Sequence, residues 1–448
     1  MKKFNKKKEL KSEKVDSSEL GKYYDEEVLK KAKKARRQKI WKIVQRVVIG
    51  VVASTVICST ARNIFISGRS YFKNSDLIPQ VTSELCTDMD MMHYEKYNNQ
   101  IIRLKPNDDG NVCVYIADNV PQRAQQNIKS SLNYFNEIFD NVNDKFNFTV
   151  GNKAEYVADR ALQNSTIKFE YKTLDEGTYG FNSHSQSLFD FPKKIFPESA
   201  NNGKYCISST ISLNDRYFDK LDDKMQQFTI RHEMLHSLGF DDVYTNNYTE
   251  FATIMNVDNF YITNEISPSD MRRLYTAYCE KYVNSNKTLN YEKLAEVKEY
   301  LNNYETQYYQ NVAEVLKDSF AGECYNITDE ELAGFTAGYG LLDVKVNANG
   351  KYEYVYNKNA QDPSKLFAGS GTVVKGDNYA ILPKIEICGF TRYYIILKDA
   401  NGLNMYYVNL DKTPIKEKTS LKANIVLRPA VPYTSYNYTP KTDDIMQR

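Results

Sequence analysis

The sequence predicts an α+β protein in which a mixed helix-and-strand domain precedes a small all-β domain. Strand and helix patterns alternate between about residues 108 and 285, as expected for a twisted sheet covered by helices. A charged, tyrosine-rich helical pattern follows over 286–324, and two Asn-Gly pairs indicate β-hairpins within 325–448. A basic segment, an apolar segment and a polar, irregular stalk are expected before these domains, over 1–46, 47–66 and 67–107.

The basic and apolar segments at the N-terminus predict a membrane anchor. Residues 1–46 carry 17 Lys and Arg against 7 Asp and Glu, although the whole chain has a net charge of only +2. No charged residue occurs from Val47 to Ala61, so we expect 47–66 to span the membrane with 1–46 in the cytoplasm. The small residues Ser59, Thr60 and Ala61 also fit a cleaved signal peptide, and a buried core helix is a third alternative. Each of the first two interpretations places the remaining chain outside the cytoplasmic membrane.

The basic residues of this segment indicate contact with anionic headgroups rather than with nucleic acid, because they adjoin an apolar run. Solvated charges that only set the membrane topology explain them equally well. Six cysteines follow the apolar run, an even number that an exported chain could pair, but their scattered positions define no connectivity. No CxxC motif indicates a cysteine zinc site.

Periodicity predicts the elements of the 108–285 domain. Helical spacing is clearest where Ile128, Leu132, Phe135 and Phe139 share one face. Ser267 and Pro268 resemble the start of a helix, with proline in the first turn. In chain order we expect a strand over 113–117, a helix over 121–139, strands over 166–171 and 205–213, and helices over 219–238 and 271–282.

A connector helix and a hairpin-rich domain are expected to follow. The helical pattern of the connector covers Leu289–Phe320. Asn349-Gly350 and Asn401-Gly402 each separate two alternating apolar runs, the pattern typical of a hairpin with a type I′ turn.

Two of the four histidines of the chain, His232 and His236, flank Glu233 in the order His-Glu-x-x-His. Residues four apart on a helix lie on one face, so both imidazoles can direct a ring nitrogen at the same metal ion. Glu233 would then stand beside that ion as a general base. The spacing therefore predicts a zinc site that hydrolyses its substrate.

A catalytic zinc ion has three protein ligands and an open position for water, so a third ligand must be found. Gly239 can end the helix in a sharp turn, which would return Asp242 to the metal. Asp241 is adjacent and competes for the role, although the spacing favours Asp242.

The resulting motif, His-Glu-x-x-His-x-x-Gly-x-x-Asp, resembles the signature of the metzincin superfamily of zinc endopeptidases, HExxHxxGxxH followed by a methionine-containing turn. Met255 stands 19 residues after His236, in the place of the Met-turn. Aspartate as the third ligand looks like the snapalysin variant within the superfamily. The resemblance covers about 108–285 and implies a zinc endopeptidase fold, with Met255 as a hydrophobic floor under the metal rather than a ligand.

The expected reaction is hydrolysis of peptide bonds in a protein or peptide substrate. Zinc would activate a water molecule while Glu233 takes its proton and passes it to the leaving amine. Substrate is expected to add as a strand to a sheet edge, for which 207–214 is the candidate, unless that strand is interior. The rival hypothesis is a cell-surface binding or adhesion protein whose zinc site is structural or vestigial.

Overall fold

The computed structural model describes parts of the chain between residues 78 and 429. All described residues belong to one compact unit, Phe65–Arg448. They are residues 78–86, 96–97, 100–101, 103–142, 146–162, 164–186, 205–242, 253–255, 262–284, 286, 288–339, 342–357, 366–387, 390–410, 419–420 and 425–429.

The fold class predicted from the sequence is wrong in one respect, the N-terminal transmembrane anchor. Among the residues just given, no helix is both long enough and apolar enough to cross a membrane. The segment 47–66, on which the prediction was based, lies outside them, as does the basic segment 1–46. The corrected class is an α+β protein with mixed sheets.

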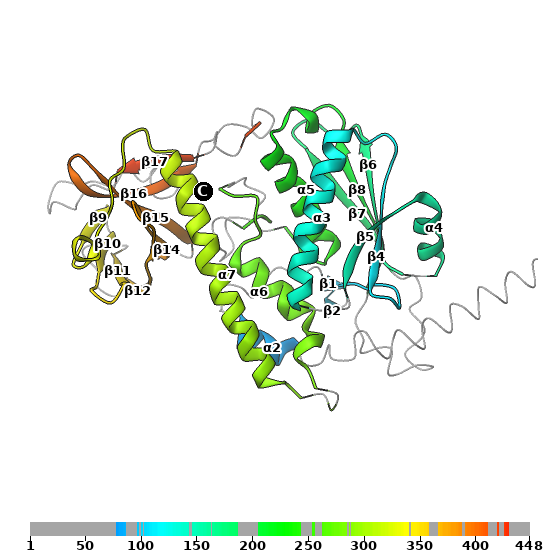
Figure 1. The fold of residues 1–448 in the computed structure, drawn as a ribbon, viewed down its shortest axis with the longest axis horizontal. Helices are drawn as coiled ribbons and strands as arrows, with labels where there is room; N and C mark the ends of the chain where they lie inside the picture. Colours follow the sequence, from blue (N-terminus) through cyan, green and yellow to red (C-terminus); the bar gives the residue numbers. More distant parts are fainter. Residues whose placement is uncertain are drawn as a thin grey trace, which may run out of the picture. The chain divides into compact units, whose positions relative to one another are not determined.

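A six-stranded sheet forms the first domain (Figure 1). Its strands are β3 (Arg103–Leu104), β4 (Asn111–Ile116), β5 (Asn147–Gly151), β6 (Thr166–Lys172), β7 (Gly180–Gln186) and β8 (Tyr205–Asn214). The order is β3-β8-β6-β4-β5, all parallel, and β7 pairs antiparallel with β8. The short pair β1 (Lys96–Tyr97) and β2 (Gln100–Ile101) forms a separate hairpin.

The candidate edge strand for substrate, 207–214, is interior. Ile211 of β8 pairs with Phe169 of β6 on one side and with Asn182 of β7 on the other. Both hydrogen-bonding sides of β8 are therefore occupied, and β7 is the edge strand at this end of the described sheet.

Helices cover both faces of this sheet. Successive side chains of a strand point to opposite faces, so a strand can contact helices on both sides. Val112 and Val114 of β4 lie in the main core together with Ile128 of α3 (Gln122–Val142). Tyr115 points the other way and its ring contacts Tyr156 of α4 (Lys153–Ala161). Figure 1 shows α3 and α5 (Asp223–Ser237) along one side of the sheet and α4 on the other. A short 3-10 turn, η4 (Phe218–Lys220), precedes α5.

The region expected as a stalk, 67–107, contributes to the core of the first domain. Residues Ile78–Leu85 form helix α2, and Val81 and Leu85 are buried in the main core. The side chain of Arg103 in β3 is buried and donates from Nη1 to the carbonyl of Ala277 at 2.7 Å. These contacts attach the segment to α6 (Pro268–Ala277), whose N-cap Ser267 and first-turn proline match the expected helix start.

After α6 the chain forms η5 (Cys279–Tyr282), the long helix α7 (Tyr291–Asp318) and the one-turn α8 (Asp329–Leu332). Helix α7 corresponds to the expected connector. Its first half packs in the main core through Leu294 and Leu301, and its second half packs against the β domain through Tyr308 and Val312. The connector is therefore a packed element shared by two cores.

The C-terminal region forms two antiparallel sheets, as the hairpin signals predicted. Their strands are β9 (Thr336–Tyr339), β10 (Leu342–Val346), β11 (Lys351–Asn357) and β12 (Leu366–Thr372) in one sheet, and β13 (Val374–Lys375), β14 (Tyr379–Ile387), β15 (Phe390–Asp399), β16 (Gly402–Leu410) and β17 (Ile425–Pro429) in the other.

The second sheet is apolar on both faces, which explains the unbroken apolar run of β15. Ile396 belongs to the core between the two sheets, while its neighbours Ile395 and Leu397 pack in the core that contains α7. Successive side chains of a strand point to opposite faces, so a strand buried on both faces requires a continuous apolar sequence.

Both predicted hairpins are confirmed, but their glycines lie one position later in the turn than a two-residue type I′ turn requires. The amide of Gly350 donates to the carbonyl of Asn347 at 3.1 Å, and Asp399 pairs with Gly402. Each glycine is thus the fourth residue of its turn, with φ of 72° at Gly350 and 111° at Gly402. Glycine adopts these positive φ values without a side-chain clash.

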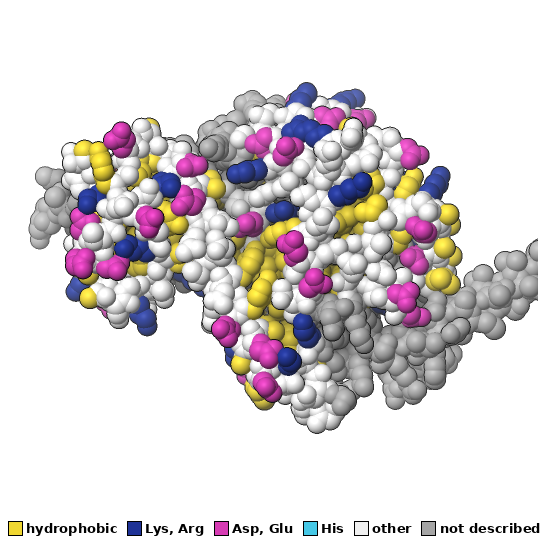
Figure 2. Space-filling view, in the orientation of Figure 1, with side chains coloured by type: hydrophobic (Ala, Val, Ile, Leu, Met, Phe, Trp, Pro, Cys, Tyr) yellow, Lys and Arg dark blue, Asp and Glu magenta, His cyan; other side chains and the backbone are white. Residues whose placement is uncertain are grey.

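The surface in view carries basic and acidic side chains intermixed (Figure 2). Apolar side chains are exposed over α4, where Val157 lies in the middle of the helix and Leu162 is its C-cap. Exposed apolar side chains are common on the surfaces of folded domains.

Candidate metal centre

Helix α5 carries the His-Glu-x-x-His residues and ends where the sequence predicts. Its N-cap Asp222 accepts a hydrogen bond from the amide of Met225 at 2.7 Å. At the other end, Gly239 has a φ of 96°, and the amide of Phe240 donates back to the carbonyl of Leu235. This left-handed turn reverses the chain and brings Asp242 over the helix.

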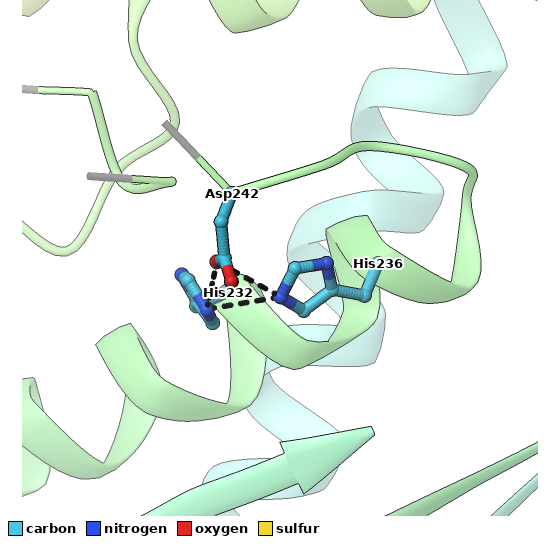
Figure 3. A group of neighbouring side chains, drawn as sticks. All are labelled: His232, His236 and Asp242. Carbon is cyan, nitrogen blue, oxygen red and sulfur yellow. Dashed lines mark hydrogen bonds and ion pairs between the residues drawn. The ribbon is translucent and has the colours of Figure 1, made fainter. Parts of the chain in front are cut away.

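His232, His236 and Asp242 converge on one point (Figure 3). Asp242 Oδ1 lies 3.4 Å from His232 Nε2 and 3.3 Å from His236 Nε2, and the two Nε2 atoms are 3.1 Å apart. Asp241 is exposed and is not one of this group. The structure therefore brings together the three residues that the sequence predicts as ligands.

The opposite nitrogen of each imidazole is held by a backbone carbonyl. His232 Nδ1 lies 2.8 Å from the oxygen of Ile254, and His236 Nδ1 lies 2.8 Å from the oxygen of Phe240. A carbonyl only accepts, so each Nδ1 carries the proton and donates it. In the neutral rings, the lone pairs of both Nε2 atoms are then available to a metal ion.

The donor set fits a cation. Asp242 Oδ1 is buried and accepts no hydrogen bond, and its nearest polar neighbours are the two Nε2 atoms. Burial acts to raise the pKa of the Asp242 carboxyl, but hydrogen bonding and positive charge from His232 and His236 in their protonated forms outweigh it and hold that pKa below its usual range. Two imidazole nitrogens and one carboxylate oxygen can therefore hold a metal ion at this place.

Glu233 lies on the same helix with its carboxylate buried. Its side chain is 5% exposed, and burial raises its pKa while the two histidines act in the opposite direction. A Cβ placed on Gly180 of β7 would stand 2.8 Å from Glu233 Oε1 and 2.9 Å from its Cγ. Only glycine leaves room for the carboxylate here.

Edge strand β7 is attached to α5 by side-chain hydrogen bonds as well. Asn182 Nδ2 donates to the carbonyl of Glu233 at 2.6 Å and to Ser237 Oγ at 2.8 Å. Ser209 of β8 completes the group, with its hydroxyl 2.6 Å from that of Ser237. These hydrogen bonds hold strand β7 against the helix that carries Glu233.

Met255 is fully buried, in the main core, and the two residues before it are buried too. Ile254 supplies the carbonyl for His232, so this turn supports the histidine through its backbone. Sequence reasoning missed the roles of Ile254, Phe240 and Gly180. The first two could have been suspected because metal-bound imidazoles usually donate to a carbonyl or carboxylate, but no sequence signal indicates Gly180.

No protein-family model matches the chain, and no curated protein matches it. The resemblance to metzincins consequently rests on the motif residues alone, from His232 to Met255.

Proposed function

We propose that this protein is a zinc-dependent endopeptidase. The observation that carries the proposal is the convergence of His232 Nε2, His236 Nε2 and Asp242 Oδ1 beside the buried carboxylate of Glu233. Two imidazoles and one carboxylate leave a fourth position of a tetrahedral zinc ion open, which distinguishes catalytic from structural zinc sites. A structural site has no use for a buried glutamate next to its ligands.

The residues of the chain have separate tasks in this reaction. The three ligands would hold zinc, which when bound supplies a Lewis acid for water activation and carbonyl polarisation. Glu233 accepts the proton of the attacking water and then donates it to the departing amine. Its burial beside the ligands supports this role, because a shielded carboxylate can take the proton of the water and return it within the site.

The outer edge of β7, which pairs with no other strand of the described sheet, supports a peptide as the substrate. An extended peptide can add to a sheet edge through main-chain hydrogen bonds, which give affinity with little demand on side-chain identity. Gly180 at the start of β7 lies against Glu233, so a peptide paired along β7 would pass the proposed catalytic carboxylate. Strand β7 replaces 207–214 as the proposed docking edge.

Cleavage of an unbiased peptide library tests the proposal. We expect the purified chain to cleave internal peptide bonds, to lose this activity when zinc is removed by a chelator, and to regain it with stoichiometric zinc. The adhesion alternative predicts zinc binding with no cleavage of any library member, and that result would exclude the endopeptidase.

A further inference from the structure

Helix α6 contains a buried ion pair that is connected, through other residues, to His232 and His236 of the candidate metal centre. Asp270 is 0% exposed and Arg273 is 2% exposed, and Asp270 Oδ1 accepts a hydrogen bond from Arg273 Nη2. Burying two charges is costly unless their remaining hydrogen bonds are satisfied, so a buried pair requires an account beyond stability. Each member of this pair reaches towards a different histidine.

Asp270 connects to His232 through the Met-turn. The Thr253 hydroxyl donates to Asp270 Oδ2, and Thr253 Oγ1 accepts a hydrogen bond from the amide of Met255 at 3.2 Å. This fixes the backbone on both sides of Ile254, whose carbonyl oxygen receives the Nδ1 proton of His232. Between the carboxylate and the imidazole there are only Thr253 and one peptide unit.

Arg273 connects to His236 through Phe240. Its guanidinium carbon lies 5.3 Å from the centre of the Phe240 ring, within the range of a cation–π contact. The carbonyl oxygen of Phe240 receives the Nδ1 proton of His236. Phe240 is fully buried, so its ring and its carbonyl are constrained together.

We propose that the Asp270–Arg273 pair positions both imidazoles of the metal centre, through Thr253 and Ile254 on one side and through Phe240 on the other. Neither residue touches the metal position, so both are positioning residues. Partners of this kind set the tautomer and ring orientation of a metal-binding histidine, and their removal typically costs about 10- to 100-fold in metal affinity. The inference rests on the metal site and is independent of peptidase activity.

A competing explanation is that Asp270 only stabilises the start of α6. Its amide donates to Ser267 Oγ at 3.1 Å, and its Oδ2 accepts from the same hydroxyl at 2.9 Å. Ser267 thus shares the helix-capping contacts of Asp270, but has no described bond to the Met-turn. This difference supplies a matched pair of variants.

The test compares Thr253→Val with Ser267→Ala in the full chain. Valine has the shape of threonine without its hydroxyl, so the first variant cuts the connection between Asp270 and the Met-turn. The second variant removes the cap and one hydrogen bond to Asp270 Oδ2, but it keeps the bond between Thr253 and Asp270. Zinc affinity is measured by competition with a chromophoric chelator. The visible absorption spectrum of the Co²⁺-loaded protein reports ligand geometry, and urea unfolding of the metal-free protein reports stability.

We expect Thr253→Val to weaken zinc binding about 10- to 100-fold and to change the Co²⁺ spectrum. Ser267→Ala should lower the stability of the metal-free protein while leaving zinc affinity within about twofold and the Co²⁺ spectrum unchanged. Asp270→Asn should weaken zinc binding to the same extent as Thr253→Val. The double variant, Asp270→Asn with Thr253→Val, should bind zinc as tightly as each single variant, because both changes break the same connection.

Equal zinc affinity in wild type and Thr253→Val would overturn the proposal, and so would an equal loss in Ser267→Ala. If Asp270→Asn does not fold, the Thr253 and Ser267 variants still decide the matter. Zinc binding without peptidase activity would refute the proposed function but leave this inference standing, whereas a wild-type chain that binds no zinc would overturn both.

Discussion

The backbone of Gly180 on the edge strand lies directly against the carboxylate of Glu233 on helix α5. These residues are 53 positions apart, yet a single added methyl group at 180 would come within 2.9 Å of Glu233 Cγ and Thr229 Cγ2. The same strand edge is the proposed docking position for substrate. This contact therefore joins the substrate-binding and proton-transfer parts of the proposed site.

Gly180→Ala should impair catalysis without removing the metal. The methyl group must displace Glu233, and a shift of about 1 Å in a catalytic group can cost about 100-fold in rate. We expect kcat/KM for a reporter peptide to fall by about that factor, with one zinc ion still bound per chain. Ser183→Ala, on the same strand but exposed, is the control; similar activity of the Gly180 variant and wild type would show that Glu233 tolerates the displacement.

Asp242 and Asp241 should differ sharply in their effect on metal binding. Asp242 places Oδ1 next to both Nε2 atoms, whereas Asp241 is exposed and outside the group. Asp242→Ala removes a ligand, so we expect zinc affinity to fall by more than about 100-fold, beyond the usual loss for an outer partner. Asp241→Ala should leave it nearly unchanged. Isothermal titration with zinc measures both, and equal effects would rule out the ligand assignment.

Glu305 of α7 should contribute to stability by joining the two cores. Its carboxylate accepts from Arg272 of α6 and also forms an ion pair with Lys384 of β14. The pair with Arg272 is largely shielded, because the side chains of Arg272 and Glu305 are 10% and 16% exposed. We expect Glu305→Ala to lower the free energy of unfolding by about 1–3 kcal/mol, because a shielded guanidinium loses its carboxylate. Glu299→Ala, exposed on the same helix, should change it little; denaturant titration compares them.

The part of the site that could be predicted from the sequence lies within one short segment of the chain. The four-residue spacing of His232 and His236 and the turn at Gly239 act within one short segment, so helix geometry alone predicts their convergence with Asp242. Gly180 meets Glu233 only after the sheet has formed. Nothing in the residues around position 180 encodes that contact.

The position of strand 207–214 within the sheet also depends on contacts that form only when the sheet assembles. In β8, the polar residues Ser208, Thr210 and Ser212 alternate with the apolar Ile211 and Leu213. Such alternation reports which face of a strand is covered. It carries no information about pairing in the plane of the sheet, where β7 occupies the remaining side of β8.

Composition alone did not predict the structure of the segment 67–107, which was expected to be a stalk. Its polar character suggested an extended linker, yet the amphipathic stretch from Ile78 to Leu85 buries Val81 and Leu85 against the first domain. A single helix of two turns is too short to stand out from a polar background.

Peptide hydrolysis by Glu233→Ala at matched zinc content tests whether Glu233 is the general base of a zinc endopeptidase. We expect this variant to bind one zinc ion per chain, as wild type does, and to lose at least about 100-fold in kcat, because the general base is gone while the ligands remain. Hydrolysis at the wild-type rate by zinc-loaded Glu233→Ala would contradict this role of Glu233.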